Sequence, residues 1–123
     1  MCPAFQTVVE TPEFLIRAKR LLSDAERVAM VDWLATHPNA GDLMVGSGGA
    51  RKLRWAAKGK GKRGGVRAIT FYGGRKLPVF LLSVFGKGEQ ANLTMAERNA
   101  LKTILMELAR EYRKGAARNV KGR

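Results

Sequence analysis

The stretch that decides the predicted fold is Leu77–Gly86, LPVFLLSVFG. It is almost wholly apolar, which is typical of a strand covered by other elements on both faces of its sheet. Pro78 is compatible with a strand because proline is tolerated near a strand's first residue. We therefore predict a central strand here, and the rest of the chain should supply its neighbours and its cover.

Two more strands are predicted before this one. Residues 66–72, VRAITFY, are rich in β-branched and aromatic side chains. Residues 50–56, ARKLRWA, alternate in character, so Lys52 and Arg54 should share one face while the apolar side chains share the other. A glycine- and lysine-rich loop and the turn GGRK connect the three strands, which predicts a meander.

The N-terminal part predicts one strand and two helices. Residues 4–10, AFQTVVE, are short and β-branched, as in a strand. Thr11 then provides an N-cap for a first helix, and Ser23 with Glu26 forms a capping box for a second helix that Pro38 ends. Because only a few residues connect these helices, we expect a helical hairpin.

The C-terminal part predicts one long helix. Thr94 and Glu97 form its capping box, and Gly115 is expected to end it. The element order is then strand, helix, helix, three strands and helix, which indicates an α+β fold. We expect a single domain over residues 1–115 and a basic, disordered tail over residues 116–123.

Positive charge is concentrated in the middle of the chain. Residues 51–88 contain eleven Lys or Arg and no acid, whereas residues 1–50 have a net charge of −2. Such uncompensated charge favours a polyanionic partner, most commonly a nucleic acid. A membrane surface would favour an amphipathic helix with a basic face instead. The absence of a long apolar run or a signal peptide, with Cys2 as the single cysteine, predicts a cytoplasmic protein without a membrane partner.

Several common catalytic sites have no support in the sequence. His37 and Cys2 are the only His and Cys, and one of each cannot build a zinc site. The glycine-rich segments GSGGAR and GKGKRGG do not match the phosphate-binding pattern that ends in Gly-Lys-Ser/Thr. We therefore predict no metal and no cofactor.

The basic residues themselves are the candidate site. A solubilising surface mixes both signs of charge, whereas this segment has one sign only. Lys52, Arg54 and Arg67 also lie in predicted strands, which hold side chains more rigidly than loops do. This favours an anion-binding site.

The segments RKLRW (51–55), GVRAITFY (65–72), LLSVFGKGE (81–89) and NLT (92–94) resemble the RelE/HigB toxin family, most closely the HigB branch. The resemblance implies a RelE-like fold, with a small antiparallel sheet and helices packed against one side. It also implies metal-independent, ribosome-dependent cleavage of messenger RNA and inhibition of translation. The chain departs from many relatives at Gly88 and Gln90, where these have an Arg and, further along, a Tyr.

By resemblance, the catalytic positions are Lys52, Arg54, Arg67 and Lys87. RNA carries its own nucleophile, the 2′-hydroxyl, so the protein mainly has to position the phosphate and stabilise its charge. Arg54 and Arg67 suit phosphate clamping, Lys52 is the candidate proton acceptor because neighbouring cations favour its neutral form, and Lys87 could hold the leaving oxygen. The residues expected to bind RNA or the ribosome are Arg51, Lys58, Lys60, Lys62, Arg63 and Tyr72.

The expected partners are messenger RNA on the ribosome, ribosomal RNA and a cognate helix-turn-helix antitoxin of the HigA type. Two alternatives stay open at this point. One is a ParE-like toxin that inhibits DNA gyrase by protein contact, and the other is a basic module that binds ribosomal RNA without cutting it.

Overall fold

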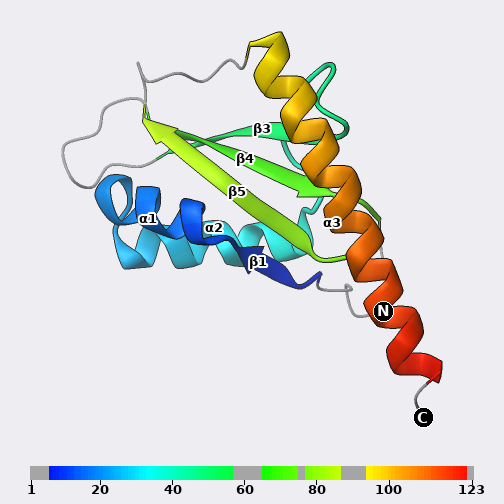
Figure 1. Ribbon diagram of the computed structural model, residues 1–123. Helices are drawn as coiled ribbons and strands as arrows, with labels where there is room; N and C mark the ends of the chain where they lie inside the picture. Colours follow the sequence, from blue (N-terminus) through cyan, green and yellow to red (C-terminus); the bar gives the residue numbers. More distant parts are fainter. Residues whose placement is uncertain (1–5, 57–64, 75–76, 87–93, 122–123) are drawn as a thin grey trace.

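The computed structural model describes residues 6–56, 65–74, 77–86 and 94–121, with side chains described as far as Lys114 (Figure 1). Its elements, in chain order, are β1 (Val8–Glu10), α1 (Pro12–Leu21), α2 (Asp24–Thr36), β2 (Asp42–Leu43), β3 (Ala50–Trp55), β4 (Val66–Tyr72), β5 (Val79–Gly86) and α3 (Met95–Lys121).

The five strands form one sheet in the order β1-β5-β4-β3-β2. Strands β2 to β5 pair antiparallel with their neighbours, and β1 pairs with β5 in parallel. The predicted α+β class and element order are confirmed. The expected antiparallel sheet is in fact mixed, and it has one strand that was not predicted, β2, between α2 and β3. A two-residue strand is too short to produce a recognisable alternation in the sequence.

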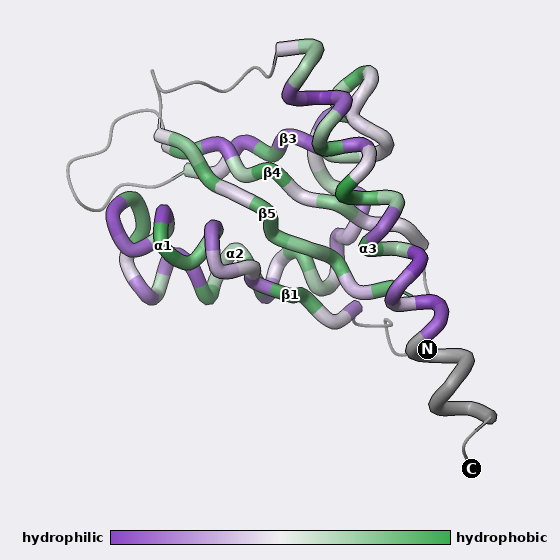
Figure 2. Tube along the Cα trace, viewed as in Figure 1, coloured by the Kyte–Doolittle hydropathy of each residue, from purple (hydrophilic) through white to green (hydrophobic). Residues whose placement is uncertain are grey.

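The sheet carries helices on both faces, so the expectation of helices on one side only was wrong. On one face, α1 and α2 pack against a core that contains Leu53, Ala68, Leu81 and Val84. On the other face, α3 packs against Ala50, Ile69, Phe71 and Phe80. Both sets of alternating strand positions are apolar, so each face needs cover. Figure 2 shows the hydrophobic residues of β4 and β5 between the two helical layers.

The predicted helix starts are confirmed by their hydrogen bonds. The Ser23 backbone N–H donates to the Glu26 carboxylate (2.9 Å), and the Glu26 N–H donates to Ser23 Oγ (3.1 Å). Thr94 and Glu97 form the same reciprocal pair. The last helix, however, continues past Gly115 to Lys121. A single glycine costs a helix only about 1 kcal/mol relative to alanine, and Ala116 and Ala117 follow it.

The edge of β5 is shared between β1 and α1. β1 has only three residues and pairs with Val79, Phe80 and Leu81. Immediately after it, the Thr11 hydroxyl donates to the Leu81 carbonyl (2.8 Å) at the start of α1. Helix α1 contacts β5 and therefore borders this strand beyond the end of β1. Its side chains can reach around the edge to the α3 face.

None of the helices in the described part of the chain is both long enough and apolar enough to cross a membrane.

Candidate nucleic-acid interface

Three basic side chains share one face of the sheet. Arg54 on β3 lies directly opposite Arg67 on β4, and Lys52 lies two residues before Arg54 on the same face. Cβ atoms of directly opposite residues are roughly 4.5–5.5 Å apart. The prediction that Lys52 and Arg54 share a face is confirmed, because Leu53 and Trp55 pack into the core on the other face. We call Lys52, Arg54 and Arg67 the cation cluster.

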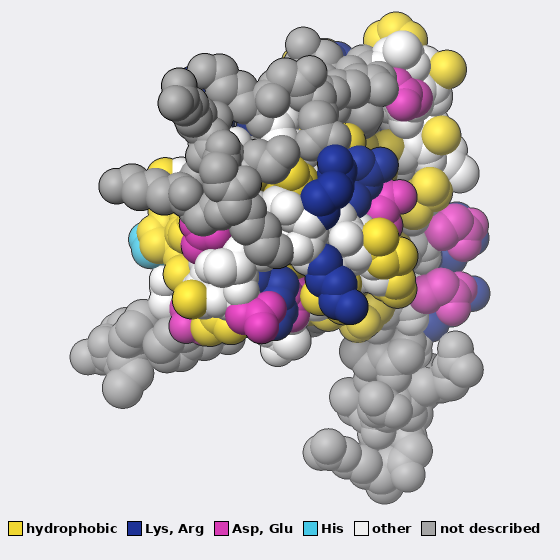
Figure 3. All heavy atoms as spheres, turned by 90° about the vertical axis from the view of Figure 1, so that its left-hand side faces the viewer, with side chains coloured by type: hydrophobic (Ala, Val, Ile, Leu, Met, Phe, Trp, Pro, Cys, Tyr) yellow, Lys and Arg dark blue, Asp and Glu magenta, His cyan; other side chains and the backbone are white. Residues whose placement is uncertain are grey.

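The cation cluster lies at the end of the sheet that α3 leaves open. α3 covers the end that contains Ala50, Phe71 and Phe80. At the other end of β3, Arg54 is exposed and Arg67 opposite it is half-buried. In Figure 1, α3 crosses the right-hand part of the sheet, and the left-hand ends of β3, β4 and β5 project beyond it. Figure 3 views the molecule from that side and shows Lys and Arg side chains beside hydrophobic and acidic ones.

The arginines of the cluster differ from those that stabilise the fold. Arg27 donates to the Glu10 carboxylate, and this hydrogen bond and the charge of Glu10 raise the pKa of Arg27. Within the described part of the chain, neither Arg54 nor Arg67 forms such a pair with an acidic side chain. Like charges directly opposite each other destabilise a sheet, so this pair is explained better by an anionic ligand than by stability.

Arg17 is a fourth cation that the sequence did not reveal. Its guanidinium lies over the Phe85 ring, 4.9 Å from the ring centroid. Phe85 is directly opposite Arg67 on the same face of the sheet, so Arg17 reaches the margin of the cation cluster from α1. Its side chain also pairs with Glu13 at 3.9 Å. Only the position of α1 along the edge of β5 brings these residues together, and no local pattern encodes it.

The other predicted RNA-binding residues are not gathered here. Arg51 points to the opposite face from Lys52, and its guanidinium donates to the Gly41 carbonyl (3.1 Å). Tyr72 is at the far end of β4, opposite Val79. Lys58, Lys60, Lys62, Arg63 and Lys87 lie outside the described residues.

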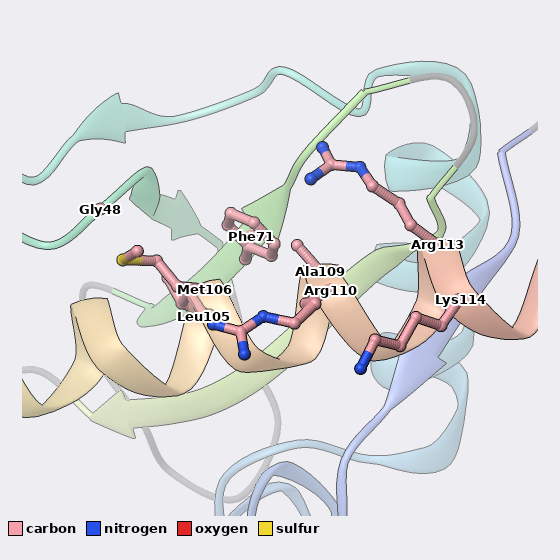
Figure 4. A pocket seen from close by; sticks show the side chains of 8 residues that line it. All are labelled: Gly48, Phe71, Leu105, Met106, Ala109, Arg110, Arg113 and Lys114. Atoms are coloured by element: carbon pink, nitrogen blue, oxygen red, sulfur yellow. The ribbon is translucent and has the colours of Figure 1, made fainter.

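A second basic surface lies at the covered end of the sheet. A hollow of about 570 Å³ is lined by Gly48, Phe71, Leu105, Met106, Ala109, Arg110, Arg113 and Lys114. Figure 4 shows three basic side chains of α3 around its apolar floor. We call it the Phe71 hollow. Because Phe71 lies at the opposite end of β4 from Arg67, this hollow is separate from the cation cluster.

The chemistry available at the cation cluster is electrostatic. Among the described residues, no group of three His, Cys, Asp or Glu could hold a metal ion. His37, at the end of α2, is exposed and stacked on Trp33, with its Nδ1 2.9 Å from the Trp33 carbonyl. The cluster can fix a phosphate and stabilise negative charge that develops on it.

The chain also matches a protein-family model. A model described as the RelE toxin of the RelE/RelB toxin–antitoxin system matches residues 13–121. The match runs from α1 to the end of α3 and includes all three residues of the cation cluster.

Proposed function

The chain belongs to the RelE toxin family of toxin–antitoxin systems, and from this premise we propose that it is a ribosome-dependent endoribonuclease that cuts messenger RNA and so inhibits translation. The closer likeness to the HigB branch is part of this proposal.

The cross-strand pair of Arg54 and Arg67 carries the proposal. Two guanidinium groups held on neighbouring strands can each donate two parallel hydrogen bonds to phosphate oxygens. They are attached to a rigid sheet, so little ordering is needed when the phosphate binds. A toxin that acts only by contact with another protein has no need of two opposed arginines on an open sheet face.

The proposed reaction uses the nucleophile of the RNA itself. The 2′-oxygen attacks the adjacent phosphorus, the bond from phosphorus to the 5′-oxygen breaks, and a 2′,3′-cyclic phosphate and a free 5′-hydroxyl form. One proton leaves the 2′-hydroxyl and one reaches the departing 5′-oxygen. Arg54 and Arg67 stabilise the extra negative charge on the phosphate, because arginine stays protonated throughout. Lys52 is proposed as the proton acceptor, and Lys87 as the residue that holds the leaving oxygen.

The proposed dependence on the ribosome follows from the composition of the cation cluster, which includes no histidine to act as general base. His37 is at the end of α2, away from the cations, so the proposed proton acceptor is a lysine instead of the more common histidine. We expect free RNA to bind through its phosphates, with an affinity that falls steeply as salt rises, and to be cut slowly. The ribosome would supply the aligned RNA conformation that makes attack by the 2′-oxygen efficient.

The antitoxin is proposed to bind the helical hairpin. Ile16 is 73% exposed on α1 and Val28 is 47% exposed on α2. Close to Ile16, a hollow of about 360 Å³ lies between the two helices, lined in part by Leu15, Leu22 and Arg27. This apolar surface is separate from the cation cluster. An antitoxin bound there would inhibit by making the toxin too large for the ribosome instead of by covering its arginines.

Expression in bacteria tests the proposed function. The wild-type chain should arrest growth, and mapped transcript ends should fall within translated regions. The double variant Arg54→Gln/Arg67→Gln, expressed to the same level, should do neither. Arrest with DNA-damage signalling and intact transcripts would favour the gyrase alternative, and arrest with intact transcripts and stalled ribosomes would favour a non-catalytic ribosome binder.

A further inference from the structure

A hollow of about 270 Å³ adjoins the cation cluster. It lies on the α3 face of the sheet and combines side chains from α1, β4, β5 and α3. Its lining residues are Glu13, Ile69, Leu82, Ser83, Phe85, Glu97, Ala100, Leu101 and Ile104. We call it the Ser83 hollow.

The sheet register connects the Ser83 hollow to the cation cluster. Ile69, in its wall, lies directly opposite both Lys52 and Ser83. Phe85, also in its wall, lies directly opposite Arg67. Residues that line the hollow are therefore cross-strand neighbours of the cations. A molecule whose phosphate contacts the cluster would place its adjacent group at this hollow.

Among the described residues, Ser83 provides a polar group without a hydrogen-bond partner amid the apolar side chains that β4 and β5 contribute to the hollow. The residue is only 6% exposed, and its hydroxyl has no hydrogen-bond partner within the described part of the chain. A buried hydroxyl that makes no hydrogen bond destabilises the folded state. Ser83 lines the hollow, and rotation of its hydroxyl about χ1 would let it bond to a ligand with a hydrogen-bonding edge.

The margin of the hollow carries two carboxylates and one aromatic ring. The Glu13 carboxylate is 3.9 Å from Arg17, and that of Glu97 accepts from the Thr94 N–H at 2.9 Å. These contacts limit how the carboxylates can turn, and ionised carboxylates accept hydrogen bonds but do not donate them. The Phe85 ring offers an apolar surface for a flat group. The ligand that fits is flat, apolar on its faces, a hydrogen-bond donor at its edge and joined to a phosphate.

We propose that the Ser83 hollow is a base-recognition pocket for RNA, selective for bases that carry an exocyclic amino group. That the ligand is RNA rests on the proposed function. Adenine, cytosine and guanine each present an amino group to carboxylate acceptors. Uracil presents carbonyl oxygens on both sides of its single N–H, and these would face the lone pairs of Glu13 and Glu97. Uracil should therefore bind worst.

Binding of short RNAs without ribosomes tests the pocket separately from cleavage. Four oligouridines are compared that differ only in one central base, A, C, G or U, with a 2′-deoxy sugar at that position so that attack there is impossible. Fluorescence anisotropy should show the amino-bearing bases bound about tenfold more tightly than uracil, the effect of one well-formed set of base contacts. The Ser83→Ala variant should bind the RNAs with the preferred bases several-fold more weakly than wild type does, and its affinity for the uracil RNA should be unchanged.

A pocket-filling variant and a matched control complete the test. Ala100 is exposed on α3 and lines the hollow, so Ala100→Leu should fill it without disturbing the core. This variant should bind all four RNAs within about twofold of one another, at the affinity set by phosphate contacts alone. Asn99→Leu, one residue earlier and outside the lining, should keep the wild-type preference. Equal binding of the four RNAs by wild type, or an unchanged preference in Ala100→Leu, would refute the proposed base-recognition pocket. Neither result would count against phosphate binding by the cation cluster. Failure to bind any of them would count against the proposed function itself.

Discussion

Replacing Arg67 with glutamine should stabilise the protein and inactivate it at the same time. Arg67 lies directly opposite Arg54, at the end of the sheet that α3 leaves open. Taking the Cβ spacing of directly opposite residues, about 5 Å, as the separation of the two charges gives a repulsion of about 0.8 kcal/mol in a water-like environment. Measured cross-strand pair effects are about 0.2–1 kcal/mol. Glutamine is shorter but still polar, and it removes the positive charge, so the free energy of unfolding should rise by roughly 0.5 kcal/mol.

The corresponding shift in melting temperature is small but measurable. With an unfolding entropy of about 2.1 cal/mol/K per residue over 123 residues, 0.5 kcal/mol corresponds to a rise of about 2 °C. The same substitution removes one of the two guanidinium groups proposed to stabilise the phosphate. Cleavage on the ribosome should therefore fall by about 10²–10³-fold. The slope of log K against log salt for single-stranded RNA should become shallower by about 0.7.

Thermal melts in about 20 mM and about 1 M salt separate charge repulsion from other effects, because 1 M salt screens charges beyond about 3 Å. The stabilisation should be present at low salt and vanish at high salt. Arg113→Gln, a loss of the same charge on an exposed turn of α3, is the control and should leave cleavage unchanged. A loss of more than 1 kcal/mol of stability in Arg67→Gln, or full ribosomal cleavage by it, would refute the reasoning.

Three further predictions follow from the same structure. Arg54→Lys keeps the charge but loses the planar fork, so ribosomal cleavage should fall about tenfold, while an unchanged rate would show that only charge matters there. Phe14→Ala removes a fully buried ring from the hairpin core and should cost about 3–5 kcal/mol in urea unfolding, whereas Leu15→Ala, at a 39% exposed position, should cost under about 1 kcal/mol. Gly65→Ala would make its Cβ clash with the Trp55 carbonyl oxygen at a φ of +78°, so it should destabilise the protein by more than about 1 kcal/mol; equal stability would mean that the chain reaches β4 by another path.

Much of the fold could be predicted because it depends on local signals. The capping box of Ser23 and Glu26 acts over three residues, and it formed as expected. The alternation in β3 placed Lys52 and Arg54 on one face, since the period of a strand is two whatever its neighbours are. The boundaries of β4 agree with the predicted strand at residues 66–72.

What could not be predicted depends on register and on contacts between distant residues. The register between β3 and β4 decides which residue lies opposite Arg54. This register depends on how two strands pair across a loop, and no rule based on composition specifies it. The contact of Arg17 with Phe85 requires α1 to lie along the edge of β5. The apolar stretch of β5 indicated cover on both faces, but it could not indicate which helix takes which face.

The parallel pairing of β1 with β5 has a consequence for how the protein is made. Val8 pairs with Val79, which follows it 71 positions later in the chain. At a synthesis rate of about 5–20 residues per second, β5 follows β1 by roughly 4–14 s. Until then, Phe14 and Leu21 of α1 have no β5 to pack against, and pairing between such distant segments is slow in any case. The time between translation of this chain and its activity is thus set partly by topology. A partner that binds the nascent hairpin could intercept the protein before its sheet is complete.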